Sequence, residues 1–302
     1  MGINIHNVKR WLKMITGQSL EHVKQGIGKI YSISEIKGYY NDLTEKVTKD
    51  KNYDKIQLPI LKTGTGETVL FPIAIFQYGL GAYDLYLLTN KNTFLNIFKL
   101  CVDWAYQNQT KNGSWDNFSF KQPEAPYSAM TQGEGASLLI RAYKEFNKEK
   151  YFIAAKKAIE FLVTPIENGG TAKYRGNDIF LLEFTNKPVV LNGWIFSLFG
   201  LYDYLLVDKD KDIMEVYKGS VQTLVNHLEH FDNGFWSKYD IENLIASPFY
   251  HNVHIAQLHV MYQLTNEEIF MYYKDKWNKY RCKFPNRSRA LLLKAYQKIT
   301  EK

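Results

Sequence analysis

The segment FGLYDYLLVDKDKDIMEVYKGSVQTLV at residues 199–225 decides the fold. An apolar stretch with helical spacing runs into the charged turn VDKDKD, and a second amphipathic stretch follows. Related segments recur as GAYDLYLLTNKNTFLNIFKLCVDW (81–104), IRAYKEFNKEKYFIAAKKAIEFL (140–162) and HVMYQLTNEEIFMYYKDKWNKY (259–280). Matching tyrosines stand 60, 59 and 60 residues apart, at Tyr83, Tyr143, Tyr202 and Tyr262. This period predicts a helical hairpin that is repeated four times.

The connections between these hairpins predict where a site would lie. Three of them begin with an Asn-Gly pair, at 112–113, 168–169 and 233–234, which favours the tight turn of a short β-hairpin. Long connections in an array of helical hairpins lie on one side, so residues 111–135, 167–193 and 232–255 are expected to converge on one rim. We predict a mainly α-helical, incomplete (α/α) toroid of about four hairpins, with short β-hairpins in the connections and a cleft at one end.

Length and composition agree with a packed domain. The chain has 302 residues, of which 45% are hydrophobic, and this excludes a disordered or collagen-like chain. We expect a helical or extended lead-in over residues 1–56, packed on the body, and the toroid over residues 57–302. The two cysteines, Cys101 and Cys282, suit neither a disulfide framework nor a zinc site, and they favour a reducing compartment.

The positive charge is concentrated at the C-terminal end. Residues 271–302 carry ten Lys or Arg and two acids, a sum of +8, while the other 270 residues sum to −1. Such a segment fits a solvated helix face, or contact with an acidic polymer or membrane surface. Trp11, Leu12 and Ile15, among basic residues, suit a short amphipathic helix that lies on the body or on a membrane. We expect no nucleic-acid partner, no transmembrane segment and a cytoplasmic location, with contact to the inner membrane face left open.

Four motifs point to a known family. They are PIAIFQYGL (72–80), PYSAMTQGEG (126–135), VLNGWIFSLFGLYDY (190–204) and FYHNVHIAQL (249–258). Their identity and order resemble the C-terminal domain of the D-glucuronyl C5-epimerases, which convert glucuronyl into iduronyl units in heparan-type polymers. The segment GYYNDLTEKV (38–47) is similar to the lead-in of bacterial members. The resemblance implies a uronic-acid-containing oligo- or polysaccharide as substrate, and a homodimer is left open.

The resemblance also implies a reaction and its catalytic residues. Removal of the C5 proton leaves a carbanion beside a carboxylate, and return of the proton to the other face requires a second group. The carboxylate itself stabilises the carbanion, so no cofactor is implied. Tyr250 in FYHNVH and Tyr239 in WSKYDIE match catalytic tyrosines of the family, and Glu183 in LLEF matches an active-site glutamate. A tyrosine serves as a base when its pKa, ordinarily about 10, is lowered by neighbouring donors or cations.

Two positions depart from the family pattern. Phe184 stands where the family has a third tyrosine, and phenylalanine transfers no proton. Tyr174, Tyr127 or a water held by Glu183 would then replace it, or the reaction uses one base, or no reaction occurs. Glu242 stands where animal members carry an arginine. The negative charge of Glu242 disfavours sulfated heparan as the substrate.

We expect further substrate-binding residues in the connections and the first helical turns: Tyr127, Gln132, Asn192, His251, His254, Gln77 and Tyr174. The histidines have metal-like HxxH spacing, but no carboxylate or cysteine set completes a metal site, so hydrogen bonding is expected instead.

Three alternatives to the epimerase function stay open. A uronate polysaccharide lyase shares the first step and needs one base, a glycosidase needs two carboxylates across the bond, and a non-catalytic glycan-binding or assembly protein needs neither.

Overall fold

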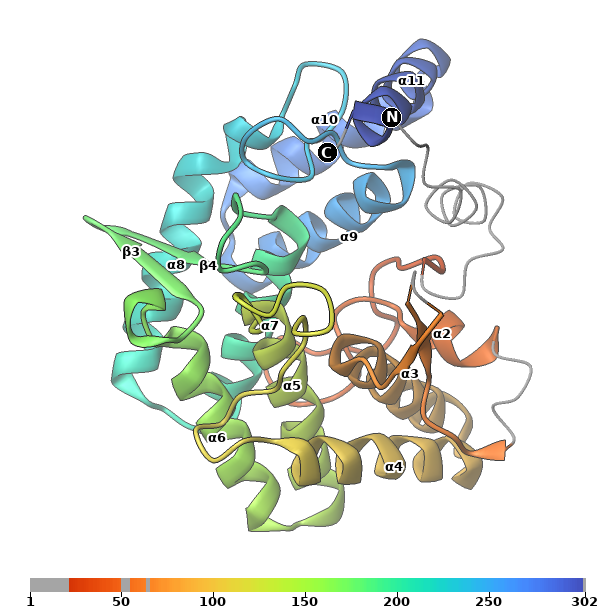
Figure 1. Ribbon diagram of the computed structural model, residues 1–302, viewed down its shortest axis with the longest axis vertical. Coiled ribbons are helices and arrows are strands. Elements are labelled where there is room, and N and C mark those ends of the chain that lie inside the picture. Colours follow the sequence, from red (N-terminus) through yellow and green to blue (C-terminus); the bar gives the residue numbers. More distant parts are fainter. Residues whose placement is uncertain (1–21, 50–54, 64–65, 301–302) are drawn as a thin grey trace.

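The computed structural model describes residues 22–49, 55–63 and 66–300 (Figure 1). Within them, consecutive helices form four antiparallel hairpins: α3 (Pro72–Thr89) with α4 (Asn92–Asn108), α5 (Ala129–Phe146) with α6 (Glu149–Val163), α7 (Leu191–Val207) with α8 (Lys211–His227), and α9 (Pro248–Thr265) with α10 (Glu268–Cys282). A last helix, α11 (Phe284–Thr300), follows. The predicted repeat of helical hairpins in an incomplete (α/α) toroid is confirmed.

The first helix of each hairpin lies inside the toroid and the second outside. Residues 129–142 of α5 are all buried, whereas α4 buries one stripe that includes Phe94, Phe98 and Cys101. The inner helices pack in the order α3, α5, α7 and α9. Where α5 meets α7, a side chain at Gly200 would come within 2.3 Å of the Gly133 backbone, so this close approach requires glycine. Because α9 and α3 do not pack closely on each other, the ring is incomplete on that side.

Residues 31–40 of the lead-in bond the C-terminal halves of α3, α7 and α9, and α2 (Thr44–Thr48) packs on α3. Tyr40 donates a hydrogen bond of 2.9 Å to Asp203 on α7, and Arg141 on α5 forms a fully buried ion pair of 2.6 Å with the same carboxylate. Arg141 also donates to the carbonyl oxygens of Lys37 and Gly38, at 2.9 Å each. These bonds fix the lead-in across one end of the toroid. The predicted basic helix around Trp11 lies outside the described residues, and the domain boundary at residue 56 stays a prediction.

Two short antiparallel β-hairpins occur among the described residues, one before α3 and one in the connection between α6 and α7, the only one of the three predicted connections that contains paired strands. One pairs β1 (Leu61–Lys62) with β2 (Thr68–Val69), and the other pairs β3 (Ala172–Arg175) with β4 (Asp178–Leu181). The Asn-Gly pair at 168–169 does not make the turn of the second hairpin. It ends the 3-10 helix η2 (Ile166–Asn168), and the hairpin turns at Gly176 instead. Both glycines have positive φ, which explains why either position suits a turn.

No helix among the described residues is long and apolar enough to cross a lipid bilayer.

Candidate functional site

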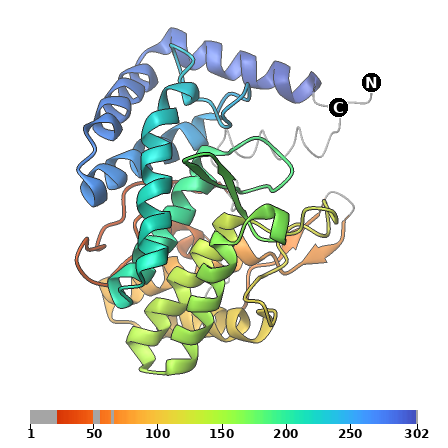
Figure 2. The ribbon, with the colours of Figure 1, turned by 90° about the vertical axis from the view of Figure 1, so that its left-hand side faces the viewer.

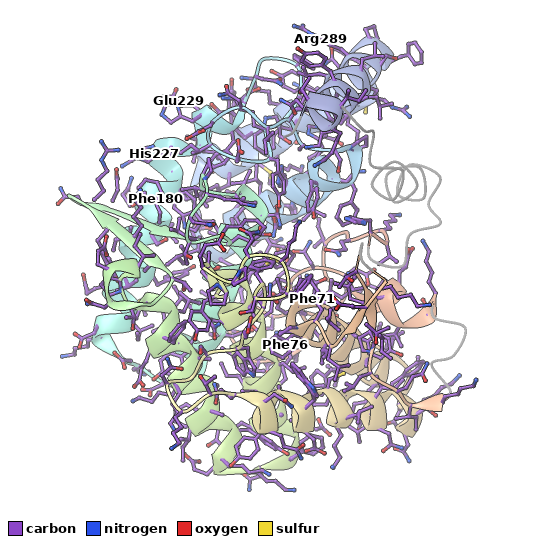
Figure 3. The ribbon with its side chains drawn as sticks, in the orientation of Figure 1. Phe71, Phe76, Phe180, His227, Glu229 and Arg289 are labelled. Carbon is purple, nitrogen blue, oxygen red and sulfur yellow. The ribbon has the colours of Figure 1, made fainter. Side chains whose placement is uncertain are left out.

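The connections meet at the N-terminal ends of the inner helices. The amide of Ala129, at the start of α5, donates to the carbonyl of Leu182 after β4, at 2.8 Å. The amide of Leu191, at the start of α7, donates to the carbonyl of Tyr239, at 3.1 Å. Phe71 precedes α3, lies near the middle of the molecule in Figure 3, and packs on Phe118 from the next connection. The expected convergence of these connections on one rim is therefore present.

Glu183 lies at the centre of this rim. It lies two residues after the end of β4. Its side chain is so close to the first turn of α7 that a Cβ at position 193 would stand 2.4 Å from Glu183 Oε2, which makes Gly193 necessary. The residue is only 7% exposed, and Oε2 has no hydrogen-bond partner. Burial raises the pKa of Glu183 to about 7, although a hydrogen bond from Tyr239 and the charge of Lys187 act in the opposite direction. This carboxyl therefore changes its protonation near neutral pH.

The two tyrosines predicted to be catalytic lie beside Glu183. Tyr239 donates from its hydroxyl to Glu183 Oε1 across 3.5 Å. The ring of Tyr250, in the first turn of α9, has its centroid 4.9 Å from that of Tyr239. The pKa of Tyr239 is raised well above 10, first by burial and then by the neighbouring Glu183 and Tyr250. The lowered pKa expected for a tyrosine base is thus not found for Tyr239, which keeps its proton at neutral pH.

A second buried carboxyl, Glu134 on α5, was missed by sequence reasoning. Gln77 on α3 donates to Glu134 Oε1 at 2.8 Å, and Glu134 Oε2 is buried without a partner. Burial raises the pKa of Glu134 to about 8, although the hydrogen bond from Gln77 and the charge of Lys46 act in the opposite direction; the charge of Glu183 acts in the same direction as burial. The signal in the sequence was a carboxylate between Gly133 and Gly135, because glycines at these positions permit other elements to pack closely against the helix.

Other buried polar groups near the helix N-termini lack partners. Both side-chain polar atoms of Gln132 are buried without a hydrogen bond, as are Asn192 Oδ1 and Gln257 Oε1. Gln257, which the sequence analysis did not select, donates from Nε2 to the carbonyl of Asn192 at 3.1 Å. Each unsatisfied buried group costs about 1–3 kcal/mol, so this cluster of unpartnered groups beneath the rim carries a cost in stability.

The remaining predicted residues lie elsewhere. His251 and His254 both contact the Ser237 hydroxyl, at 2.8 and 3.0 Å, and His251 also contacts the Trp277 carbonyl oxygen at 3.1 Å. Burial lowers the pKa of His251 to about 3, so this histidine is neutral. The network fastens the connection carrying Tyr239 to α9 and α10.

Tyr127, Tyr174 and Phe184 make aromatic or backbone contacts around the rim. The Tyr127 ring packs edge-on against Phe161 of α6, and the Tyr174 hydroxyl donates to the carbonyl of Val163 at the end of α6. Phe184 stacks on Phe118 with a centroid distance of 4.6 Å. The structure thus brings together Glu183, Tyr239 and Tyr250, and it places Tyr127 and Tyr174 against α6. Among the described residues, no group of three His, Cys, Asp or Glu side chains is arranged to hold a metal ion.

Comparison with known proteins agrees with the motifs. Residues 111–279 match the family model described as the D-glucuronyl C5-epimerase C-terminus. A D-glucuronyl C5-epimerase of Caenorhabditis elegans is 31% identical over 210 residues, which cover 60% of this chain and 34% of the nematode protein. An uncharacterized protein of Methanocaldococcus jannaschii is 29% identical over 155 residues, covering 49% of this chain and 50% of that protein. The match therefore spans between a third and a half of the length of these relatives.

Solved structures with a similar fold are more distant in sequence. The GH76A α-1,6-mannanase of Salegentibacter sp. HEL1_6 has a TM-score of 0.45 and 12% identity, covering 76% of this chain and 64% of the mannanase. A structure of UGL with dGlcA-Glc-Rha-Glc has a TM-score of 0.48 and 12% identity, covering 82% of this chain and 67% of that one.

Proposed function

The chain belongs to the D-glucuronyl C5-epimerase family, and we propose that it converts D-glucuronyl into L-iduronyl units of a glycan. The observation that carries this proposal is the contact between Glu183 and Tyr239, a buried carboxyl whose pKa is about 7 beside a tyrosine that keeps its proton. A proton acceptor works best when its pKa lies near the working pH. The pair therefore supplies one acceptor and one donor.

The proposed reaction uses these two groups in turn. Ionised Glu183 takes the C5 proton, and the electron pair of the broken C–H bond delocalises into the uronyl carboxylate as an enediolate. Entry of the uronyl ring between the two groups separates Tyr239 from Glu183 beyond their 3.5 Å contact, and Tyr239 then delivers its proton to the opposite face of C5. After the product leaves, the contact forms again and the proton on Glu183 returns to the tyrosinate, which restores both groups. Tyr250 packs against Tyr239 and orients its ring, so the reaction does not need a hydroxyl at position 184.

The site also suits the negative charge that develops. The N-termini of α5, α7 and α9 face the rim, and their partial positive charges favour a carboxylate. Glu134, with a pKa of about 8, is mostly protonated at neutral pH, and its Oε2 lacks a partner; because the residue is fully buried, a hydrogen bond from it to the substrate requires the rim to open. A neutral carboxylic acid is an effective donor to an enolate oxygen. We assign Glu134, held by Gln77, to this role.

The preferred substrate is a glucuronyl glycan without sulfate. Glu242 is exposed in the same connection as Tyr239, and its charge disfavours a densely anionic chain.

The proposal is tested by NMR of glucuronyl glycans, including unsulfated heparosan, incubated with the protein in deuterated water. Deuterium at C5 together with iduronyl signals is the expected result. An unsaturated uronyl product would mean lyase chemistry instead. Binding without deuterium exchange on any glucuronyl glycan would refute catalysis and leave a glycan-binding protein.

A further inference from the structure

The outward face of α11 exposes an unusual set of large apolar side chains. Phe284, Leu292, Tyr296 and Ile299 are each between 63% and 76% exposed. At about 100° per residue, these four positions fall within an arc of about 120° on the helix. Single apolar residues on a surface are ordinary, but a contiguous set on one helix face marks an interaction surface.

Contacts on the opposite face fix how α11 is turned. Ala290 is buried, and the Gln297 side chain donates to the carbonyl of Asn243 at 2.7 Å and accepts from the amide of Ile245 at 3.0 Å. The Arg289 guanidinium lies 4.0 Å from the centroid of the Phe235 ring. Figure 2 shows α11 along the outer edge of the molecule, at the end away from α4 and α6, and Figure 3 shows Arg289 at that edge. The apolar arc therefore points away from the body.

Positive charge borders the apolar arc. No acidic residue occurs between positions 283 and 300, and residues 271–302 together carry +8. Arg287 is exposed about 60° beyond Phe284 on one side of the arc, and Arg289, whose guanidinium reaches Phe235, is exposed about 20° beyond Tyr296 on the other. An apolar face with cations on both flanks is the pattern of a helix that lies in a membrane interface. Its apolar side chains enter the headgroup region, and its cations meet lipid phosphates.

The charge near α11 decides which of three binding partners fits this face: a second copy of the chain, an acidic glycan or an anionic lipid bilayer. A second copy of the chain would bring two segments of +8 together, which opposes association. An acidic glycan would pair with the cations and leave the apolar arc in water. We propose that α11 docks the protein on an anionic lipid bilayer, with Leu292 and Ile299 inserted between the headgroups. This inference is independent of the reaction proposed above.

The test is cosedimentation with vesicles of phosphatidylcholine alone and of phosphatidylcholine mixed with phosphatidylglycerol. The full chain is expected to sediment with the mixed vesicles only. Leu292→Glu combined with Ile299→Glu should abolish sedimentation, whereas the matched control Ile153→Glu, at an exposed apolar position on α6, should not. Arg287→Gln should weaken binding about fivefold, because one cation contributes about 1 kcal/mol near an anionic surface.

The proposal is overturned if the unmodified chain stays in the supernatant with anionic vesicles, or if the double variant binds as well as the parent. Light scattering of the parent and the double variant provides the remaining check. A parent dimer that the double variant converts to a monomer, with no vesicle binding by either, would assign the face to a second copy. Circular dichroism of each variant establishes that it is folded, and a misfolded double variant is replaced by Leu292→Gln with Ile299→Gln.

Discussion

Replacing Glu183 by Gln should abolish the reaction and, at the same time, stabilise the fold at alkaline pH. In the unfolded chain this carboxyl has a pKa of 4.5, and burial raises the pKa to about 7 in the folded protein. Below about pH 4.5 the group is neutral in both states, so the stability is fully present. As the pH rises through 7, the folded protein must bury a charge. The stability then falls by about 3 kcal/mol, since one pKa unit corresponds to about 1.4 kcal/mol. Glutamine carries no charge and avoids this loss.

The two proteins should therefore unfold at similar urea concentrations near pH 4.5 and diverge as the pH rises. Near pH 8, Glu183→Gln should be more stable by up to about 3 kcal/mol, measured by circular dichroism in urea at both pH values. The control is Glu215→Gln on the exposed side of α8, which should show no pH-dependent difference. An equal stability difference at both pH values, or a less stable variant at pH 8, would refute the reasoning that this carboxylate is desolvated.

Three further predictions concern the rim and the lead-in. Tyr239→Phe removes the proposed proton donor and should lower the rate of C5 deuterium exchange about 10²- to 10⁴-fold. The control is Tyr174→Phe, which removes a hydroxyl that bonds the end of α6 and should leave the exchange rate near the parent value. Equal losses in the two variants would contradict the role assigned to Tyr239. Glu134→Gln retains a hydrogen-bond donor and should keep more epimerase activity by NMR than Glu134→Leu, and the reverse order would remove Glu134 from the mechanism. Asp203→Ala leaves its buried arginine partner uncompensated and should cost about 3–5 kcal/mol in urea unfolding, against less than about 1 kcal/mol for Asp275→Ala in an exposed pair.

The repeat could be predicted because helical periodicity is a local property of the sequence. The apolar spacing, the polar turns and the 60-residue period are all present before any tertiary contact is known. The exact turns were less predictable. Asn168-Gly169 has the composition of a hairpin turn, but the chain uses its positive φ to end a 3-10 helix, and the strands pair around Gly176. The sequence favours a turn at Gly169 and at Gly176, and only the pairing of β3 with β4 determines which of the two becomes the turn of the β-hairpin.

The site was only partly accessible to sequence reasoning. Glu183, Tyr239 and Tyr250 come from three separate segments, and the resemblance to a family, rather than spacing, selected them. Glu134 was missed because burial of a helical carboxylate depends on how α3 packs against α5. The HxxH pair has the spacing of metal ligands, but both histidine rings contact the Ser237 hydroxyl instead. Because Ser237 comes from another segment, the spacing of the histidines did not reveal this contact. The catalytic and binding roles of all these residues stay predictions.

The lead-in across the C-terminal ends of the inner helices limits how a glycan could bind, if the substrate is the polymer proposed above. Because Tyr40, Arg141 and Asp203 fasten that end of the toroid, a glycan bound at the rim could not continue between the inner helices toward those ends. Under the proposal, the glycan would enter and leave on the rim side. Uronyl units inside a chain would then be as accessible as those at its ends.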